Sequence, residues 1–263
     1  MPGILCLLVT SACAVKSFTP PTGSGTSFPE FAAASDEATR ECRGVKTMSV
    51  TLSLSGRAGS TRLRGNVDAG FSAPGAVRLE GRAPFGRPVF ILVAQDAANA
   101  TLLLPRDDRV LRDTPAAAIV EALAGVSLDP DELRSVIAGC GFGAGAPSGG
   151  RVYGADMAVL DFPGATQYLR RENGRWRLIA ATRGPLTIEY RDVASSRPAT
   201  VRMTTASTAT ESGSADLTMK LSDVNINVPL EADVFKIDIS PGADPLTLDE
   251  LRRAGPLGAA APR

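Results

Sequence analysis

The chain has 263 residues, of which 44% are hydrophobic and 21% are charged, and its 28 Lys and Arg residues balance its 28 Asp and Glu residues. That balance argues against a nucleic-acid partner, and the absence of histidine excludes Ser-His-Asp catalysis and histidine metal sites. We therefore expect no enzyme activity, no metal and no cofactor. Nineteen prolines and 26 glycines favour an antiparallel β protein.

The chain begins with a short apolar run, MPGILCLLVT, which is too short to cross a membrane as a helix. Residues 1–12 are predicted to be a secretory signal peptide. The small residues Ser11 and Ala12 before Cys13 are what a bacterial lipoprotein peptidase requires. We therefore expect Cys13 to be lipidated and to become the new N-terminus. The alternatives are an ordinary signal peptide and a buried N-terminal strand.

Residues 14–27 are rich in Pro, Gly, Ser and Thr, which predicts a flexible tether, lipid-anchored over 13–27. A helix is expected to follow over 28–45, where alanines favour it and Gly44 provides a stop.

Four strand runs follow, and the first two alternate apolar and polar residues with a period of two, which is typical of antiparallel strands with one wet face. The inward residues expected from these runs are Val50, Leu52, Leu54, Val67, Phe71, Leu79 and Ile91. The arginines at 62, 64, 78 and 82 are expected to solvate the outer face, with contact to lipid headgroups as the alternative.

A helical interval interrupts the strands over 113–140. Asp113 or Thr114 is expected to cap its first helix, and Asp129 its second. The apolar stripes of these helices contain Ile119, Leu123, Leu133 and Ile137.

Strands resume at Arg151, and Asn173-Gly174 predicts a two-residue hairpin between two of them. The chain is expected to end in a short helix and a loose tail over 241–263. The predicted fold is α+β and mainly antiparallel β. It is a half-open curved sheet or incomplete β-barrel of about ten strands, with an N-terminal helix and a two-helix lid.

Two cysteines, Cys42 and Cys140, lie in the body of the chain, and an even number in a secreted domain suits one disulfide. Such a bond would join the end of the first helix to the end of the lid and hold one side of the lid in place. Two unrelated buried thiols are the alternative.

The order of these elements resembles the bacterial Lol lipoprotein carriers, and the acceptor LolB more closely than the carrier LolA. The segments that carry the resemblance are the lid run AIVEALAGVSLDPDELRSVIAG (118–139), APFG (83–86) before a strand, and the ENGRWR hairpin (172–177) with Trp176. The resemblance covers 28–240. It implies a half-open barrel with a helical lid, an apolar cavity for the acyl chains of lipoproteins, and no catalytic site.

We accordingly expect an outer-membrane lipoprotein that faces the periplasm and binds acyl chains of lipids or lipoproteins, for transport or insertion at the outer membrane. A periplasmic carrier protein would be a natural partner. The residues expected to line the cavity are Val50, Leu52, Leu54, Val67, Phe71, Leu79 and Ile91 from strands, and Ile119, Leu123, Leu133 and Ile137 from the lid. The alternative is a structural or assembly lipoprotein whose cavity is filled by its own side chains.

Phe85 lies in the corner RAPFGRP between two predicted strands, flanked by Arg82 and Arg87. An aromatic residue at such a turn, ringed by arginines, suits contact with an anionic bilayer surface. The alternative is that Phe85 folds back and plugs the rim of the barrel.

Overall fold

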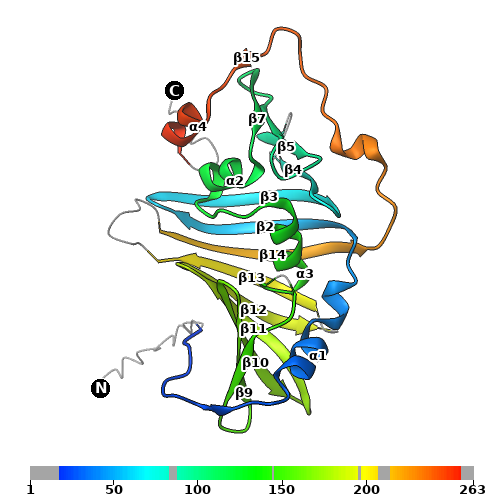
Figure 1. Ribbon diagram of the computed structural model, residues 1–263. Helices are drawn as coiled ribbons and strands as arrows, with labels where there is room; N and C mark the ends of the chain where they lie inside the picture. The colour runs from blue at the N-terminus through cyan, green and yellow to red at the C-terminus, as the bar shows by residue number, and fades with distance from the viewer. Residues whose placement is uncertain (1–17, 83–87, 144, 195–196, 207–213, 256–263) are drawn as a thin grey trace, which may run out of the picture.

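The computed structural model describes residues 18–82, 88–143, 145–194, 197–206 and 214–255. Within these ranges one large sheet curves around a set of helices (Figure 1). The four α-helices are α1 (Phe31–Arg43), α2 (Ala116–Ala124), α3 (Pro130–Ala138) and α4 (Leu248–Ala254), and a short 3₁₀-helix spans Ala232–Phe235. We call α2, α3 and their connection, residues 115–139, the lid.

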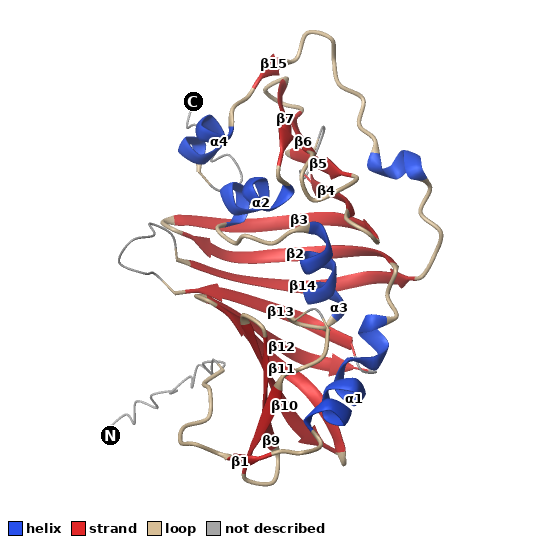
Figure 2. Ribbon diagram, viewed as in Figure 1, coloured by secondary structure: helices blue, strands red, loops and turns tan. Residues whose placement is uncertain are grey.

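The described strands form one sheet in the order β1-β8-β9-β10-β11-β12-β13-β14-β2-β3-β4-β5-β6-β7-β15 (Figure 2). Neighbours are antiparallel except β15 and β7, which pair in parallel. The two end strands do not pair with each other, so the sheet stays open, as the sequence predicted.

The strand bounds are β1 Thr26–Ser27, β2 Thr47–Ala58, β3 Thr61–Ser72, β4 Ala76–Arg82, β5 Phe90–Ala94, β6 Ala100–Leu104, β7 Arg109–Thr114, β8 Gly149–Tyr153, β9 Met157–Phe162, β10 Ala165–Glu172, β11 Arg175–Arg183, β12 Leu186–Ala194, β13 Arg197–Thr205, β14 Ala215–Ile226 and β15 Asp244–Pro245. These are fifteen strands in the described chain, more than the ten or so expected from the sequence. The end strands β1 and β15 have two residues each, too few to produce a period-two pattern. In addition, the run from Arg151 to Phe162 contains a turn and forms two strands, where one was expected.

The central strands follow the alternation of their sequences. In β2 and β3, Met48 pairs with Phe71 and Leu52 with Val67, so their apolar side chains share one face. Asn173 and Gly174 both have positive φ, 51° and 78°, and join β10 to β11 in the tight hairpin that the sequence predicted.

The ends of the lid helices are set by local sequence. Asp129 caps α3 in a capping box with Glu132, and Pro130 occupies the first turn, as expected. The expected cap of α2 by Asp113 or Thr114 is wrong, because Pro115 occupies the N-cap position and no side chain caps that helix. Thr114 instead donates its hydroxyl to the carbonyl of Arg112, at 2.9 Å.

The concave face of the sheet and the helices enclose one large hydrophobic core. Its largest fully buried side chains come from strands and lid alike, and they include Phe71, Met48, Leu92, Leu102, Ile119, Leu128, Ile137, Leu160, Leu169, Ile188 and Leu217. The helices therefore cover apolar strand faces that would otherwise meet water.

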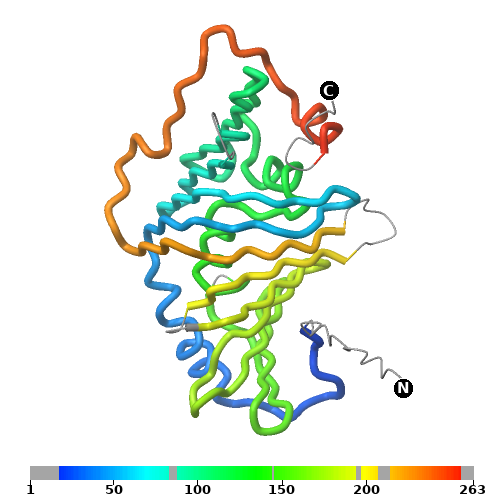
Figure 3. Tube along the Cα trace, turned by 180° about the vertical axis from the view of Figure 1, so that it is seen from behind, coloured from blue at the N-terminus to red at the C-terminus, as the bar shows by residue number. Residues whose placement is uncertain are grey.

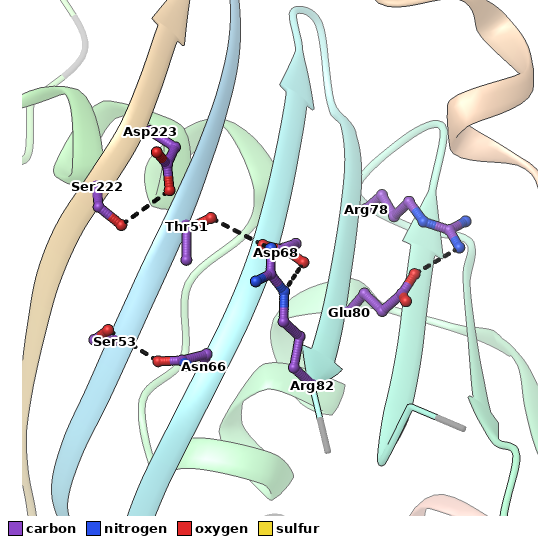
Figure 4. A network of polar contacts seen from close by, with 9 residues as sticks. All are labelled: Thr51, Ser53, Asn66, Asp68, Arg78, Glu80, Arg82, Ser222 and Asp223. Atoms are coloured by element: carbon purple, nitrogen blue, oxygen red, sulfur yellow. Dashed lines mark hydrogen bonds and ion pairs between the residues drawn. The ribbon is translucent and has the colours of Figure 1, made fainter. Parts of the chain in front are cut away.

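The convex face of β14, β2, β3 and β4 carries polar pairs (Figure 4). Asp68 accepts a hydrogen bond from the Thr51 hydroxyl at 2.9 Å and forms an ion pair with Arg82. Arg78 pairs with Glu80 at 3.0 Å and also donates to two carbonyls of the segment that follows β14. The arginines at 78 and 82 thus lie on the outer face, as expected.

The start of the described chain differs from the expected tether. Thr26 and Ser27 pair with β8, and Phe18 packs on Tyr168 with ring centroids 4.7 Å apart. Residues 18–27 are therefore held on the domain at both ends and do not form a free tether.

The chain's last described helix, α4, is the short helix that the sequence predicted. Leu251 of α4 is 1% exposed and β15 pairs with β7, so packing on the domain continues to Ala254, beyond the boundary expected at 240. Glu250 anchors this helix: its carboxylate accepts hydrogen bonds from the backbone N–H and hydroxyl of Thr247, each at 2.8 Å, and from Arg109 at 3.0 Å.

These contacts make α4 sensitive to acid. The hydrogen bonds from Thr247, and then that from Arg109, lower the pKa of Glu250 from 4.5 to about 2. A lowered folded-state pKa gives stability that is complete above pH 4.5 and is lost as pH falls from 4.5 toward 2. We expect Glu250→Gln to melt below wild type at pH 6, and the difference in Tm to shrink and vanish near pH 2. A difference in Tm that is constant from pH 6 to pH 2 would contradict this assignment.

Candidate functional site

The lid lies across the concave face of the sheet, with α3 in front of β2, β14 and β13 (Figure 1). Buried residues of α2 (Ile119, Val120, Leu123) and of α3 (Leu133, Val136) join the core beneath them. This is the packing that the two apolar stripes predicted.

A small cavity remains between the lid and the sheet, with a volume of about 80 Å³. It is lined only by apolar residues: Leu52, Leu54, Val67, Leu79, Phe90, Val120, Leu123, Ala124, Val126, Leu133, Met203, Leu217 and Met219. An apolar cavity of roughly 150 Å³ accommodates benzene. The cavity as it stands is therefore too small for an acyl chain.

The residues expected from the sequence divide into three groups. Six line the cavity: Leu52, Leu54, Val67, Leu79, Leu123 and Leu133. Four are buried in the surrounding core and do not line it, namely Val50, Phe71, Ile119 and Ile137. The expectation is thereby corrected for Val50, Phe71 and Ile119, whose tight packing leaves no space beside them. Ile137 lines a separate groove.

Ile91 forms the third group, because its side chain lies on the other face of β5. Phe90, Leu92 and Ala94 belong to the core cluster, whereas Ile91 is only half-buried and lies outside it. The run VFILVA is apolar throughout, so its sequence does not indicate which alternate residues face the core. In the structure the ring of Phe90 lies over Gly81 on the core side, and a Cβ added to Gly81 would lie 2.5 Å from the ring. Ile91, the next residue, therefore faces the other way.

Sequence reasoning also missed residues from the later strands. Met203, Leu217 and Met219 line the cavity from β13 and β14, which are far from the lid in sequence. Their alternation with polar residues marked them as inward-facing. Only the pairing of β14 with β2 brings them beneath the lid.

A second, larger hollow lies by the C-terminal end of α3. This groove has a volume of about 380 Å³. It is lined by Glu41, Cys42, Val45, Met48, Ile137, Ala138, Arg197, Pro198, Ala199, Leu221, Val224 and Ile226. Its walls are mainly apolar, and Glu41 and Arg197 are its charged members.

Helix α3 lines both the cavity and the groove. Leu133 lines the cavity, and Ile137, one turn later on the same face of the helix, lines the groove. The two spaces therefore lie at successive positions along α3.

The C-terminal end of α3 is held firmly. Cys42 and Cys140 form a disulfide with Cα atoms 5.5 Å apart, which ties the end of α1 to the residue after Gly139. The buried Tyr190 hydroxyl donates to the carbonyl of Val136 at 3.0 Å and accepts from the N–H of Gly141 at 2.9 Å. Burial raises the pKa of Tyr190, so this phenol stays neutral.

Polar contacts also hold the N-terminal half of α3. Arg134 donates to the carbonyl of Val45 at 2.5 Å and to Asp131 at 2.9 Å. Arg183 of β11 pairs with Glu132 and donates to the carbonyl of Ser127 at 2.9 Å. By contrast, α2 makes no side-chain hydrogen bond among the described residues and is held by apolar packing on the core and α4.

Two predicted site residues, Cys13 and Phe85, lie outside the described residues. Among the residues described, no group of three or more His, Cys, Asp or Glu side chains could hold a metal ion. None of the described helices is long and apolar enough to span a bilayer.

No protein-family model matches this sequence, and no curated protein matches it at a significant level. Solved structures do resemble it. A LolA superfamily protein from Nitrosomonas europaea superposes with a TM-score of 0.53, at 10% identity, over 81% of this chain and 99% of that one. The chain has the LolA-like fold.

Two further structures are less similar to this chain. A DUF1329 family protein from Desulfovibrio piger has a TM-score of 0.49 at 13% identity, over 80% of this chain and 98% of its own. A domain described as an outer membrane lipoprotein-sorting protein, from Vibrio parahaemolyticus, has a TM-score of 0.44 at 14% identity, over 72% of this chain and 88% of its own. At such identities the likeness concerns the fold, and it does not single out LolB within the superfamily.

The disulfide should contribute strongly to stability. Its cysteines are 98 residues apart, and closing a loop of that length contributes about 4 to 5 kcal/mol in the chain-entropy model. We expect a Cys42→Ser, Cys140→Ser double variant to unfold at clearly lower denaturant concentration than the oxidised protein, and reduction of the native protein to have a similar effect. Mass mapping of the non-reduced protein checks the bond directly, and two thiols open to alkylation would refute it.

Proposed function

We propose that this protein is an envelope lipoprotein that binds acyl chains of lipids or lipoproteins between its sheet and its lid, for transport or insertion at the outer membrane. The observation that carries this proposal is the apolar cavity near a mainly apolar groove, both lined by one helix, α3. Such a site needs no catalytic group, and this proposal includes no enzyme activity and no cofactor.

Burial of acyl methylene groups would provide the binding free energy, at about 0.8 kcal/mol for each CH₂. The groove, at about 380 Å³, is within the range of roughly 300 to 1,000 Å³ that is typical of small-molecule sites. The cavity, at about 80 Å³, is far below this range. An acyl chain would therefore bind first in the groove and would enter the cavity only as the lid moves.

The contacts of the lid indicate which helix would move. Helix α3 is fixed by the disulfide, by Tyr190 and by its arginine contacts, whereas α2 is held by apolar packing. Apolar packing can be replaced by an acyl chain at little cost, because the chain covers the same surfaces. We therefore propose that α2 lifts while α3 stays in place.

A second candidate is a structural or assembly lipoprotein that carries no cargo. The observation in its favour is the small size of the cavity, which the lid's own side chains nearly fill. Native mass spectrometry of the protein purified without detergent distinguishes the two. A co-purified lipid supports the carrier, and an empty protein even after incubation with lipid vesicles supports the structural role.

The groove can be tested with a matched pair of variants. Ile226 lines the groove and Val228, two residues later, is 38% exposed and does not line it. We expect Ile226→Asp to lower the retained lipid by about tenfold or more, because desolvating a carboxylate against an acyl chain costs more than about 1.4 kcal/mol. Val228→Asp should retain lipid as wild type does. Equal lipid content in the two variants would show that the groove is not the acyl site.

The anchor is tested at Cys13. Ala14 and Val15 follow this cysteine, with no Asp to retain the product at the inner membrane, so we propose the outer membrane as the location. We expect wild type to fractionate with outer membranes and Cys13→Ser to be released by a carbonate wash. A Cys13→Ser protein that remains in the membrane fraction would rule out anchoring by lipid.

A further inference from the structure

The sheet carries a second, smaller apolar cluster on its convex face. Ala158 and Leu160 of β9 point into the main core, so Val159 between them points outward. Val159 is nevertheless 4% exposed, and it forms a cluster with Tyr168 and Ala180, against which Phe18, Tyr153 and Ile179 pack. Phe18, at the start of the described chain, thus helps to bury an apolar cluster on the outer face.

This covering segment, residues 18–28, is the N-terminal strap. At one end Phe18 packs on Tyr168. At the other, Thr26 and Ser27 pair with β8, and the N–H of Phe28 donates to the carbonyl of Gly150 at 3.1 Å. Figures 1 and 3, which are opposite views, both place this first part of the chain (dark blue) beside the end of the sheet that contains β9 and β10. The strap is therefore attached at both ends.

Gly25 shows how closely the strap fits. It has φ of +64°, and an added Cβ would lie 2.9 Å from the ring of Tyr153 and 3.0 Å from the carbonyl of Val152. Only glycine suits that conformation and that approach. Residues that read as a tether by composition thus include one that the docked position requires.

Next to Phe18 the convex face has a shallow hollow of about 500 Å³. Three arginines (Arg170, Arg177, Arg191) and three acids (Glu172, Glu189, Asp192) line it, together with Phe18, Thr19, Ile179, Tyr190 and Val193. The three positive and three negative charges cancel, so the hollow has no net charge. It therefore does not repel an anionic partner.

The length of chain between Cys13 and the strap sets a limit. Four residues, 14 to 17, separate Cys13 from Phe18. The five steps from Cys13 to Phe18 span at most about 17 Å, even when fully extended. Acyl chains on Cys13 would lie in the bilayer, so Phe18 must lie within about that distance of the membrane surface. The domain cannot stand off the bilayer on a long tether.

From the docked strap and this short connection we infer that the convex face of β9 to β12 around Phe18 rests on the phospholipid bilayer. This inference depends on the lipidation of Cys13 in the proposed function. The concave face of the same strands then points away from the membrane, and the lid is accessible from the periplasm.

The test uses two matched fluorescent labels on the full chain. Arg170 and Arg112 are both exposed arginines, and they lie on β10 beside the strap and on β7 near the opposite end of the sheet order. Arg170→Cys and Arg112→Cys proteins, lipidated in a Gram-negative host, are labelled and reconstituted in phosphatidylethanolamine–phosphatidylglycerol vesicles with a headgroup-attached quencher. We expect at least about twofold stronger quenching at 170 than at 112, with little dependence on salt.

Two further variants test the cause. Phe18→Ser removes the aromatic contact with Tyr168, and an insertion of twelve Gly and Ser residues after Ser17 lengthens the connection. Each should reduce the difference between the two labels while membrane attachment is retained. If the difference in quenching between positions 170 and 112 is unchanged in both variants, the strap does not cause the orientation.

The acyl mass on Cys13 separates the failure of this inference from that of the anchor. A lipidated protein with equal quenching at both positions overturns the orientation and leaves the anchor intact. Stronger quenching at 112 also overturns it and favours contact through the opposite end of the sheet. A chain without acyl groups on Cys13 refutes the anchor and the orientation together.

Discussion

The rest of the structure depends on the need to cover the concave face of an open, fifteen-stranded sheet. Antiparallel strands that alternate apolar and polar residues leave one face that must be buried, and an open sheet cannot bury it against itself. Helices α1, α2 and α3 provide the cover. Because three short helices cover a long curved surface, the cover is incomplete, and the cavity and the groove are two places where it fails to fill the space.

The way in which these helices are attached gives the site its asymmetry. A disulfide and several polar contacts are concentrated on α3 and on its junction with α1, whereas α2 relies on apolar packing. A hydrogen bond from a buried phenol such as that of Tyr190 is costly to break without a replacement partner. Apolar contacts accept a substitute of similar shape. The same sequence therefore attaches α3 by a covalent bond and polar contacts, and α2 mainly by apolar packing.

Much of this architecture could be predicted from local pattern. The alternation in β2 and β3, the Asn173-Gly174 turn and the Asp129 cap each have a physical cause that acts within a few residues. The misses have causes that act at long range. Ile91 faces away from the core because Phe90 packs on Gly81 of the neighbouring strand. Met203 lies beneath the lid because strands distant in sequence pair with one another. No periodicity within one segment contains that information.

The N-terminal strap has the composition of a flexible tether, but its contacts hold it on the sheet. Pro, Gly, Ser and Thr make a segment flexible when nothing binds it, but Phe18 and the β1 pairing give residues 18 to 28 partners on the sheet. The side chains of the convex face differ between the two halves of the sheet. Over β2, β3 and β4 it carries paired charges such as Asp68 and Arg82 that are stable in water, whereas over β9 to β11 it carries apolar side chains that need a cover. The distribution of apolar residues on the outer face thus marks where the chain's own first segment must lie, and with it the side from which a lipid anchor at Cys13 would leave the domain.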